Sequence, residues 1–62
     1  MDLGYRLIEV TPQTENGITS YRIDYQKTKG DTGTVSYSDL ARVHSWIAER
    51  CNYGVNCRVV WH

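Results

Sequence analysis

Four side chains in the C-terminal third of the chain are of the types that bind zinc, namely His44, Cys51, Cys57 and His62. Imidazole and thiolate are the protein ligands that zinc prefers. His44 and Cys51 are seven residues apart, which places them on one face of a helix, and Cys57 follows six residues later. The spacing contains neither of the short Cys or His pairs that are typical of zinc sites. It therefore favours two buried free thiols, with a zinc site and a disulfide as alternatives, and we expect no cofactor.

The same cysteines bear on the compartment in which the chain works. Two cysteines are fewer than a disulfide-scaffolded secreted miniprotein uses. Asp2 lies where a secretory signal would carry positive charge, and no run approaches the roughly 20 apolar residues needed to span a bilayer. We therefore expect a cytoplasmic protein with no membrane partner. A reducing cytosol disfavours a disulfide between Cys51 and Cys57.

No catalytic or nucleotide-binding motif accompanies these residues. His44 and Ser45 are adjacent, and adjacent helical residues point about 100° apart, so they do not form a dyad. Gly30 and Gly33 lack the spacing and the terminal Lys-Ser/Thr of a phosphate-binding loop. A chain of 62 residues also has little material with which to enclose a concave site. We expect a protein that is not an enzyme.

Length and charge limit the architecture and the partners further. A chain this short buries only about 60% of the surface that its unfolded form exposes, so residues 1–62 are expected to form a single domain. Seven basic and seven acidic residues cancel. The long-range field that attracts nucleic acid is therefore missing from the chain as a whole.

The first part of the sequence has the pattern of an antiparallel meander. Two runs rich in strand-forming residues, Tyr5–Val10 and Ile18–Tyr25, flank the pair Asn16-Gly17, which is typical of a tight hairpin. Val35 and Tyr37 then share one face of a third strand. The sequence predicts three short strands in succession.

The hydrophobic period then changes to that of a helix. Ser36 with Asp39, or Ser38 alone, can cap a helix that runs from about residue 38 to 50. Its expected apolar stripe consists of Leu40, Val43, Ile47 and Cys51. After Asn52-Tyr53-Gly54, alternation returns over a final strand whose apolar face holds Val55, Cys57, Val59 and Trp61.

The element order β-β-β-α-β predicts a small α+β protein. A helix between the third and fourth strands implies a right-handed crossover that returns the last strand parallel to the first. We expect a two-layer sandwich in which a four-stranded mixed sheet carries the helix on one face. The sheet of such a small domain has an open edge, so a homodimer, formed by edge pairing or helix packing, is also possible.

The aromatic residues are five Tyr and two Trp, with no Phe. Tyr can close the rim of a small core with its hydroxyl in water, and both Tyr and Trp are common anchors of protein interfaces. Trp46 could instead flank the core, and Trp61 is expected to be buried because it continues the apolar face of the last strand. The residues that we expect to contact a partner are Tyr21, Arg22, Tyr25, Trp46, Arg58 and Trp61.

These features favour a protein-binding module, an inhibitor or adaptor that covers a surface of a larger bacterial protein. Very small, neutral α+β proteins of this kind look like the host-takeover and anti-defence proteins of bacteriophages. The resemblance is to a class of proteins and rests on small size, neutrality and the expected α+β fold, with no shared motif.

The alternative is a DNA-binding module. A three-stranded meander followed by a helix, over about residues 5 to 50, resembles the plan of the DNA-binding domain of plant ethylene-response factors and of the arm-binding domains of tyrosine recombinases. The resemblance implies that the sheet would face the DNA groove. Arg6, Arg22, Lys27 and Lys29 could form a basic patch there, whereas Asp24 would lie against phosphate. Nucleic acid is therefore the less favoured partner, and steep salt dependence would be its signature.

Overall fold

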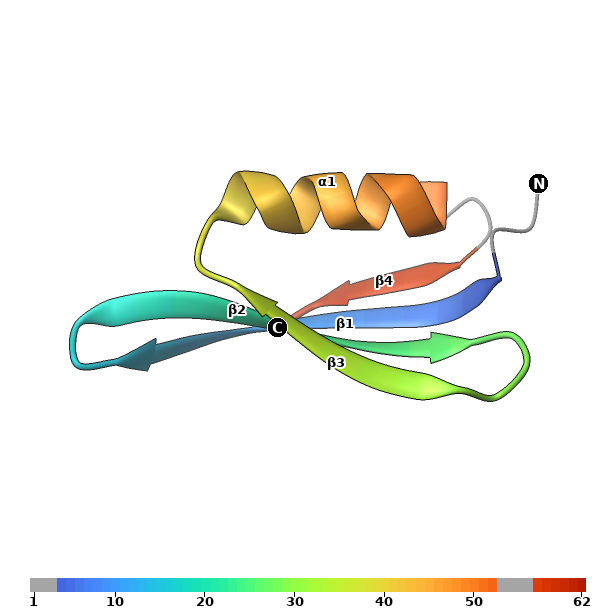
Figure 1. The fold of residues 1–62 in the computed structure, drawn as a ribbon, viewed down its shortest axis with the longest axis horizontal. Helices are drawn as coiled ribbons and strands as arrows, with labels where there is room; N and C mark the ends of the chain where they lie inside the picture. Colours follow the sequence, from blue (N-terminus) through green and yellow to red (C-terminus); the bar gives the residue numbers. More distant parts are fainter. Residues whose placement is uncertain (1–3, 53–56) are drawn as a thin grey trace.

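The computed structural model describes residues 4–52 and 57–62 of the chain, which form a sheet and one helix. The sheet has the strand order β3-β2-β1-β4, and α1 lies over one of its faces (Figure 1). β2 is antiparallel to β1 and β3, whereas β4 is parallel to β1. The predicted α+β sandwich and the parallel last strand beside the first are confirmed. The bounds are β1 Tyr5–Glu15, β2 Ile18–Lys27, β3 Thr32–Tyr37, α1 Leu40–Cys51 and β4 Arg58–Trp61.

β1 and β2 form the predicted hairpin around a two-residue turn. Asn16 and Gly17 have φ angles of 52° and 76°, the left-handed values that a type I′ turn requires and that Asn and Gly tolerate best. Both strands are longer than the sequence pattern indicates. β1 continues through Pro12 to Glu15, and β2 continues to Lys27.

Pro12 is tolerated in β1 because of the direction in which its backbone points. The carbonyl of Val10 accepts a hydrogen bond from the His62 N–H at 2.9 Å, on the β4 side. Backbone groups alternate in direction along a strand, so Pro12 also turns toward this side, where the pairing of β4 with β1 has already ended at Val10 and Trp61. A missing N–H at this position breaks no hydrogen bond of the sheet.

Beyond Val10 the hairpin continues as a two-stranded projection, which we call the arm (residues 11–20). Figure 1 shows the arm extending past the N-terminal end of α1. Residues 12–19 are all exposed. The arm is therefore held by its ladder and turn and not by the core.

The core lies between the sheet and α1. β1 and β2 point alternate residues toward the helix, and a bulge between Tyr5 and Leu7 brings Tyr5 onto the same side as Ile8. The predicted helical stripe needs one correction: Leu40, in the first turn, is 42% exposed, and Trp46 is buried in its place. The core residues are Ile8, Val10, Ile23, Val43, Trp46, Ile47, Cys51 and Cys57.

Both ends of α1 are fixed by local chemistry. The Asp39 carboxylate accepts the Ala41 N–H at 2.9 Å, so Asp39 is the N-cap. The prediction that Ser36, paired with Asp39, or Ser38 caps this end is wrong. Asn52 ends the helix in the left-handed conformation, with φ of 43°. The predicted final strand starts at Arg58 in the structure, and its expected first residue, Val55, lies outside the described residues, as does Tyr53. No helix in the described ranges has the length and apolar character needed to cross a membrane.

Candidate protein-binding surface

The four residues with zinc-binding side chains do not come together. Cys51 and Cys57 form a disulfide with their Cα atoms 5.4 Å apart, so the expectation of two free thiols is wrong. Cys51 is the last residue of α1 and Cys57 directly precedes β4, so the bridge joins the end of the helix to the start of the last strand. His44 lies against Trp61 on the helix side, whereas His62 lies on the other face, 3.3 Å from Glu9. Within residues 4–52 and 57–62, no group of His, Cys, Asp or Glu could hold a metal ion.

The six residues expected to contact a partner divide between the two faces of the sheet. The cross-strand register places Tyr21, Tyr25 and Trp61 on the side of α1, where Trp46 also lies. Arg22 and Arg58 lie on the opposite face, which we call the open face. They therefore cannot act as one site, and each face has to be considered separately.

Trp46 and Tyr25 belong to an aromatic cluster at the disulfide end of the helix. Trp46, only 7% exposed, lies with its ring centroid 5.5 Å from that of Tyr25 and 5.9 Å from that of Tyr5. The Arg50 guanidinium stacks over the Trp46 ring at 4.5 Å, and the Lys27 ammonium lies 5.5 Å from the Tyr5 ring centroid. Trp46 is therefore a core residue, and its burial removes it from the set of surface anchors.

Trp61, unlike Trp46, is exposed in the structure. The sequence pattern favours a buried Trp61, but its side chain is 46% exposed at the end of β4. The His44 and Trp61 rings have centroids 5.1 Å apart. Leu40 precedes His44 by one helical turn and so extends the same helix face.

The apolar surface around Trp61 continues onto the base of the arm. Pro12 is the next residue after Val10 on the helix side of β1, and its partner on β2 is Tyr21, which is half-buried. We call this surface the Trp61 patch, consisting of Pro12, Tyr21, Leu40, His44 and Trp61. The sequence analysis did not assign Pro12, Leu40 or His44 to a partner-binding surface. The position of Leu40 in the first turn of the predicted helix was the available signal, since helix ends cover the core least.

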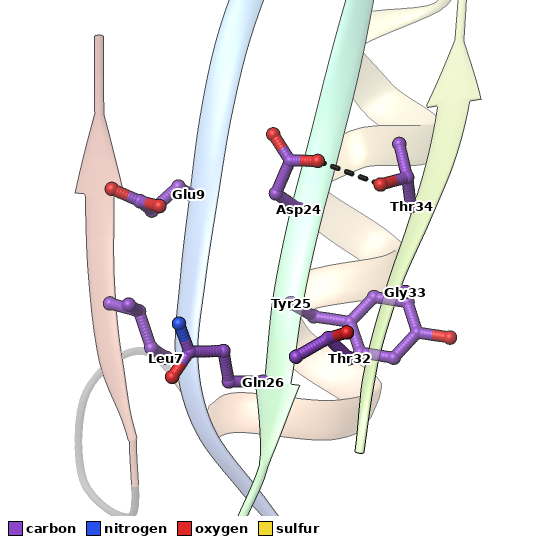
Figure 2. Close-up of a pocket in the computed structure, with 8 residues that line it drawn as sticks. All are labelled: Leu7, Glu9, Asp24, Tyr25, Gln26, Thr32, Gly33 and Thr34. Carbon is purple, nitrogen blue, oxygen red and sulfur yellow. Dashed lines mark hydrogen bonds between the residues drawn. The ribbon is translucent and has the colours of Figure 1, made fainter. Parts of the chain in front are cut away.

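The open face of the sheet is polar and internally paired. Glu9 and Asp24 are cross-strand neighbours. The Asp24 carboxylate accepts hydrogen bonds from Thr34 Oγ1 at 2.7 Å and from Arg22 Nε at 3.1 Å. Both carboxylates line a depression of about 220 Å³. Figure 2 shows them on neighbouring strands, with the hydrogen bond between Asp24 and Thr34 as a dashed line. The lining residues of the depression are Leu7, Glu9, Asp24, Tyr25, Gln26, Thr32, Gly33 and Thr34.

The depression is not an enclosed site. Arg6 donates a hydrogen bond to Gln26 at 2.7 Å, and Glu9 contacts His62, so both of these charged groups already have partners within the chain. The partly exposed Arg22–Asp24 ion pair of this face contributes little to stability. The open face is thus a hydrophilic surface, whereas the Trp61 patch is apolar.

No protein-family model matches the chain, and searches of the curated proteins and of the solved structures also return no match. The function is therefore argued from the geometry of the two surfaces.

Proposed function

We propose that the chain is a small non-enzymatic protein-binding module, an inhibitor or adaptor of a larger bacterial protein, of the bacteriophage host-takeover or anti-defence type. The observation that carries the proposal is the half-exposed Trp61, whose ring lies against His44, one helical turn after the exposed Leu40. Trp is among the residues most often found at the centre of protein interfaces, where burial of its ring contributes much of the binding energy.

The shape of the Trp61 patch supports the proposal. The patch lies at the junction of three elements, the start of α1, the end of β4 and the base of the arm. A partner that rests against Trp61 would also contact Leu40 on one side and Pro12 on the other. Of the residues that the sequence analysis selected, Trp61 and Tyr21 are in the patch. Tyr25 and Trp46 stabilise the fold, and Arg22 and Arg58 lie on the open face.

The open face offers less to a partner, and DNA binding is accordingly the weaker proposal. A DNA-binding sheet needs free basic groups, but Arg22 is paired with Asp24, and Glu9 lies opposite Asp24 on the neighbouring strand. These carboxylates would lie against phosphate. Arg58 and Arg6 are on the same face, so a weak, salt-sensitive contact is what the DNA-binding alternative predicts.

Capture from bacterial lysate tests the proposal. The bait is the intact chain, compared with Trp61→Ala and with the matched variant Ile18→Ala, which truncates a 67% exposed side chain at the tip of the arm. Each bait is used with and without nuclease, and recovered proteins are identified by mass spectrometry. We expect one stoichiometric protein that survives nuclease treatment, falls at least tenfold with Trp61→Ala and is unchanged with Ile18→Ala.

Two results would count against this function. Recovery that depends on intact nucleic acid would favour the DNA-binding alternative. Equal recovery by Trp61→Ala and the unchanged chain would remove the Trp61 patch as the binding surface, provided that Trp61→Ala still melts cooperatively.

We keep the cytoplasm as the proposed compartment, on the strength of the sequence argument. The Cys51–Cys57 disulfide is the observation against it, because the cytosol of most organisms keeps thiols reduced. Rapid alkylation of cells that express the chain, followed by mass spectrometry, decides between the cytoplasm and an oxidising compartment. Alkylated Cys51 and Cys57 would support the cytoplasm, and an intact bridge would indicate an oxidising compartment.

A further inference from the structure

The outer edge of β3 is unprotected. β3 lies at the end of the sheet, and no described strand pairs with its outer side. Natural edge strands are usually blunted by charged side chains, by Pro, by bulges or by shortness. The six residues Thr32–Tyr37 include no charge and no Pro. The other edge strand, β4, has only four residues and begins at Arg58.

The register of the sheet shows which backbone groups of β3 are free. The two-residue turn makes Glu15 and Ile18 a hydrogen-bonded pair, and every second pair along the hairpin repeats this arrangement, up to Glu9 and Asp24. Even-numbered residues of β2 therefore turn their N–H and C=O toward β1. The odd-numbered residues turn theirs toward β3, in agreement with the Lys27 N–H, which donates to the Asp31 carbonyl at 2.7 Å.

The partners of those odd-numbered residues on β3 are Gly33, Val35 and Tyr37, which complete the ladder. The N–H and C=O groups of the three intervening residues, Thr32, Thr34 and Ser36, are consequently directed outward. They form a row with regular spacing, ready to pair with another strand.

We propose that β3 pairs with β3 of a second copy of this chain, antiparallel, about a two-fold axis that passes beside Thr34. In this register Thr34 lies opposite Thr34 of the second copy, and Thr32 lies opposite Ser36. Both outward backbone groups of all three residues then find partners, on both strands. The two sheets become continuous, with both helices on the same face.

The side chains on the helix side fit this register. Gly33 would lie opposite Val35 of the second copy. The Tyr25 ring occupies the space above Gly33, where a Cβ atom would collide with it. Figure 2 shows the ring crossing β3 at Gly33, with its hydroxyl beyond the outer edge of the strand. Because Gly33 has no side chain, the Tyr25 ring lies at the point where Val35 of the second copy would pack. Contacts between an aromatic ring and a β-branched side chain are favourable across strands.

Charge also favours a second copy as the occupant. β3 carries no charged residue, so symmetric pairing places no like charges opposite one another, and on the open face the central pair is two threonines. The inference is independent of the proposed function, because β3 and the strand that bears Trp61 are at opposite edges of the sheet.

Equilibrium sedimentation over a hundredfold range of concentration tests the pairing. The unchanged chain is expected to rise from 7.2 kDa toward twice that mass. Thr34→Lys places two ammonium groups opposite each other and should weaken dimerisation at least tenfold, as should Thr34→Glu. An equimolar mixture of the two variants should restore the dimer, since Thr34 faces only itself across the axis. Thr19→Lys is the matched control, because it also replaces an exposed threonine that has one side-chain contact, with Thr14.

Ser36→Pro provides a second variant that blocks the edge without touching the ladder inside the sheet. It removes an outward N–H, and the extended conformation of Val35 is compatible with a following proline. We expect a cooperative melt and a monomer at every concentration. A monomeric unchanged chain would overturn the proposal. So would a dimer that persists in both Thr34→Lys and Ser36→Pro, and so would failure of the Lys and Glu variants to associate when mixed.

Discussion

The two ends of the hairpin differ in how they are held. At the start of β1 and the end of β2, the sheet is covered by the last turns of α1, by the cluster of Tyr5, Tyr25 and Trp46 and by the Cys51–Cys57 disulfide. We call this the closed end. At the other end the arm consists of two strands with no helix above them, and residues 12–19 are exposed.

The difference shows how a 62-residue chain divides its few stabilising interactions. A domain this small has little stability to spare, and the interactions that supply it are gathered where the helix covers the sheet. The Trp61 patch lies at the boundary between the covered and uncovered parts. The core holds the apolar side chains of the patch in place without burying them. A binding surface on a small protein requires side chains of this kind.

The largest predicted contrast is between the two tryptophans. Trp46→Ala should destabilise the fold by about 3–5 kcal/mol, because it leaves a cavity against Tyr5 and Tyr25. Trp61→Ala should cost less than about 1 kcal/mol, since the Trp61 ring is half-exposed. Urea denaturation followed by circular dichroism measures both. Should Trp46→Ala prove unfolded, Trp46→Phe gives a smaller loss that can be compared with Trp61→Phe. Equal losses at the two positions would contradict the assignment of one to the core and the other to the surface.

Loss of the disulfide is the next largest effect, and it tests the closed end. Closing so short a loop between Cys51 and Cys57 contributes about 2 kcal/mol through the entropy of the unfolded chain. We expect the double variant Cys51→Ala/Cys57→Ala to lose about this amount in thermal melting. Adding a strong reductant to the unchanged chain should lower its melting temperature but leave that of the double variant unaltered. A melting temperature insensitive to reductant would show that the bridge is absent in solution.

A smaller effect is expected at the tip of the arm. Gly17 has a φ of 76°, and a side chain in the left-handed region costs about 1–2 kcal/mol, so Gly17→Ala should destabilise the hairpin by roughly that amount. Thr19→Ala, at an exposed position nearby, is the control and should change stability by less than about 0.5 kcal/mol. Nuclear magnetic resonance shifts would locate the change in the arm. If Gly17→Ala also shifted or removed the resonances of the closed end while the chain stayed folded, the two ends would not be distinct.

The smallest effect is predicted on the open face. Arg22 and Asp24 form an ion pair 3.1 Å long in which both side chains are partly exposed. Solvent screening reduces the value of such pairs to about 0–1 kcal/mol, and salt reduces it further. Arg22→Ala should therefore melt within a few degrees of the unchanged chain at high salt. A large, salt-independent loss would show that the open face contributes to stability as the closed end does.

The strand and helix order could be predicted because local patterns specify it. Asn16-Gly17 marks the turn, alternation marks Ile18–Tyr25, and helical spacing marks α1. The extension of β1 through Pro12 could not be predicted locally. It depends on where β4 stops, which decides the side to which the missing N–H points.

The candidate site was predicted less well, because exposure is a property of tertiary packing. The local pattern leaves Trp46 off the apolar stripe of the helix and puts Trp61 on the apolar face of a strand. In the structure Trp46 is covered by two tyrosines and an arginine, whereas Trp61 lies at the exposed end of a short strand. The disulfide, one of the alternatives for Cys51 and Cys57, was ranked below free thiols for a related reason. Proximity of Cys51 and Cys57 depends on how the end of α1 packs beside the start of β4, whereas the sequence interpretation relied on an expected compartment.

Amide hydrogen exchange of the chain, alone and saturated with the captured target protein, tests the account most directly. In the free chain we expect the slowest amides at Ile8, Val10 and Ile23 and fast exchange along the arm. Binding should add protection at Trp61 and at residues 40–44, with no change on the open face at Glu9 and Asp24. Protection confined to the open face, or slow exchange of the arm in the free chain, would contradict the division between a stabilising closed end and a binding Trp61 patch.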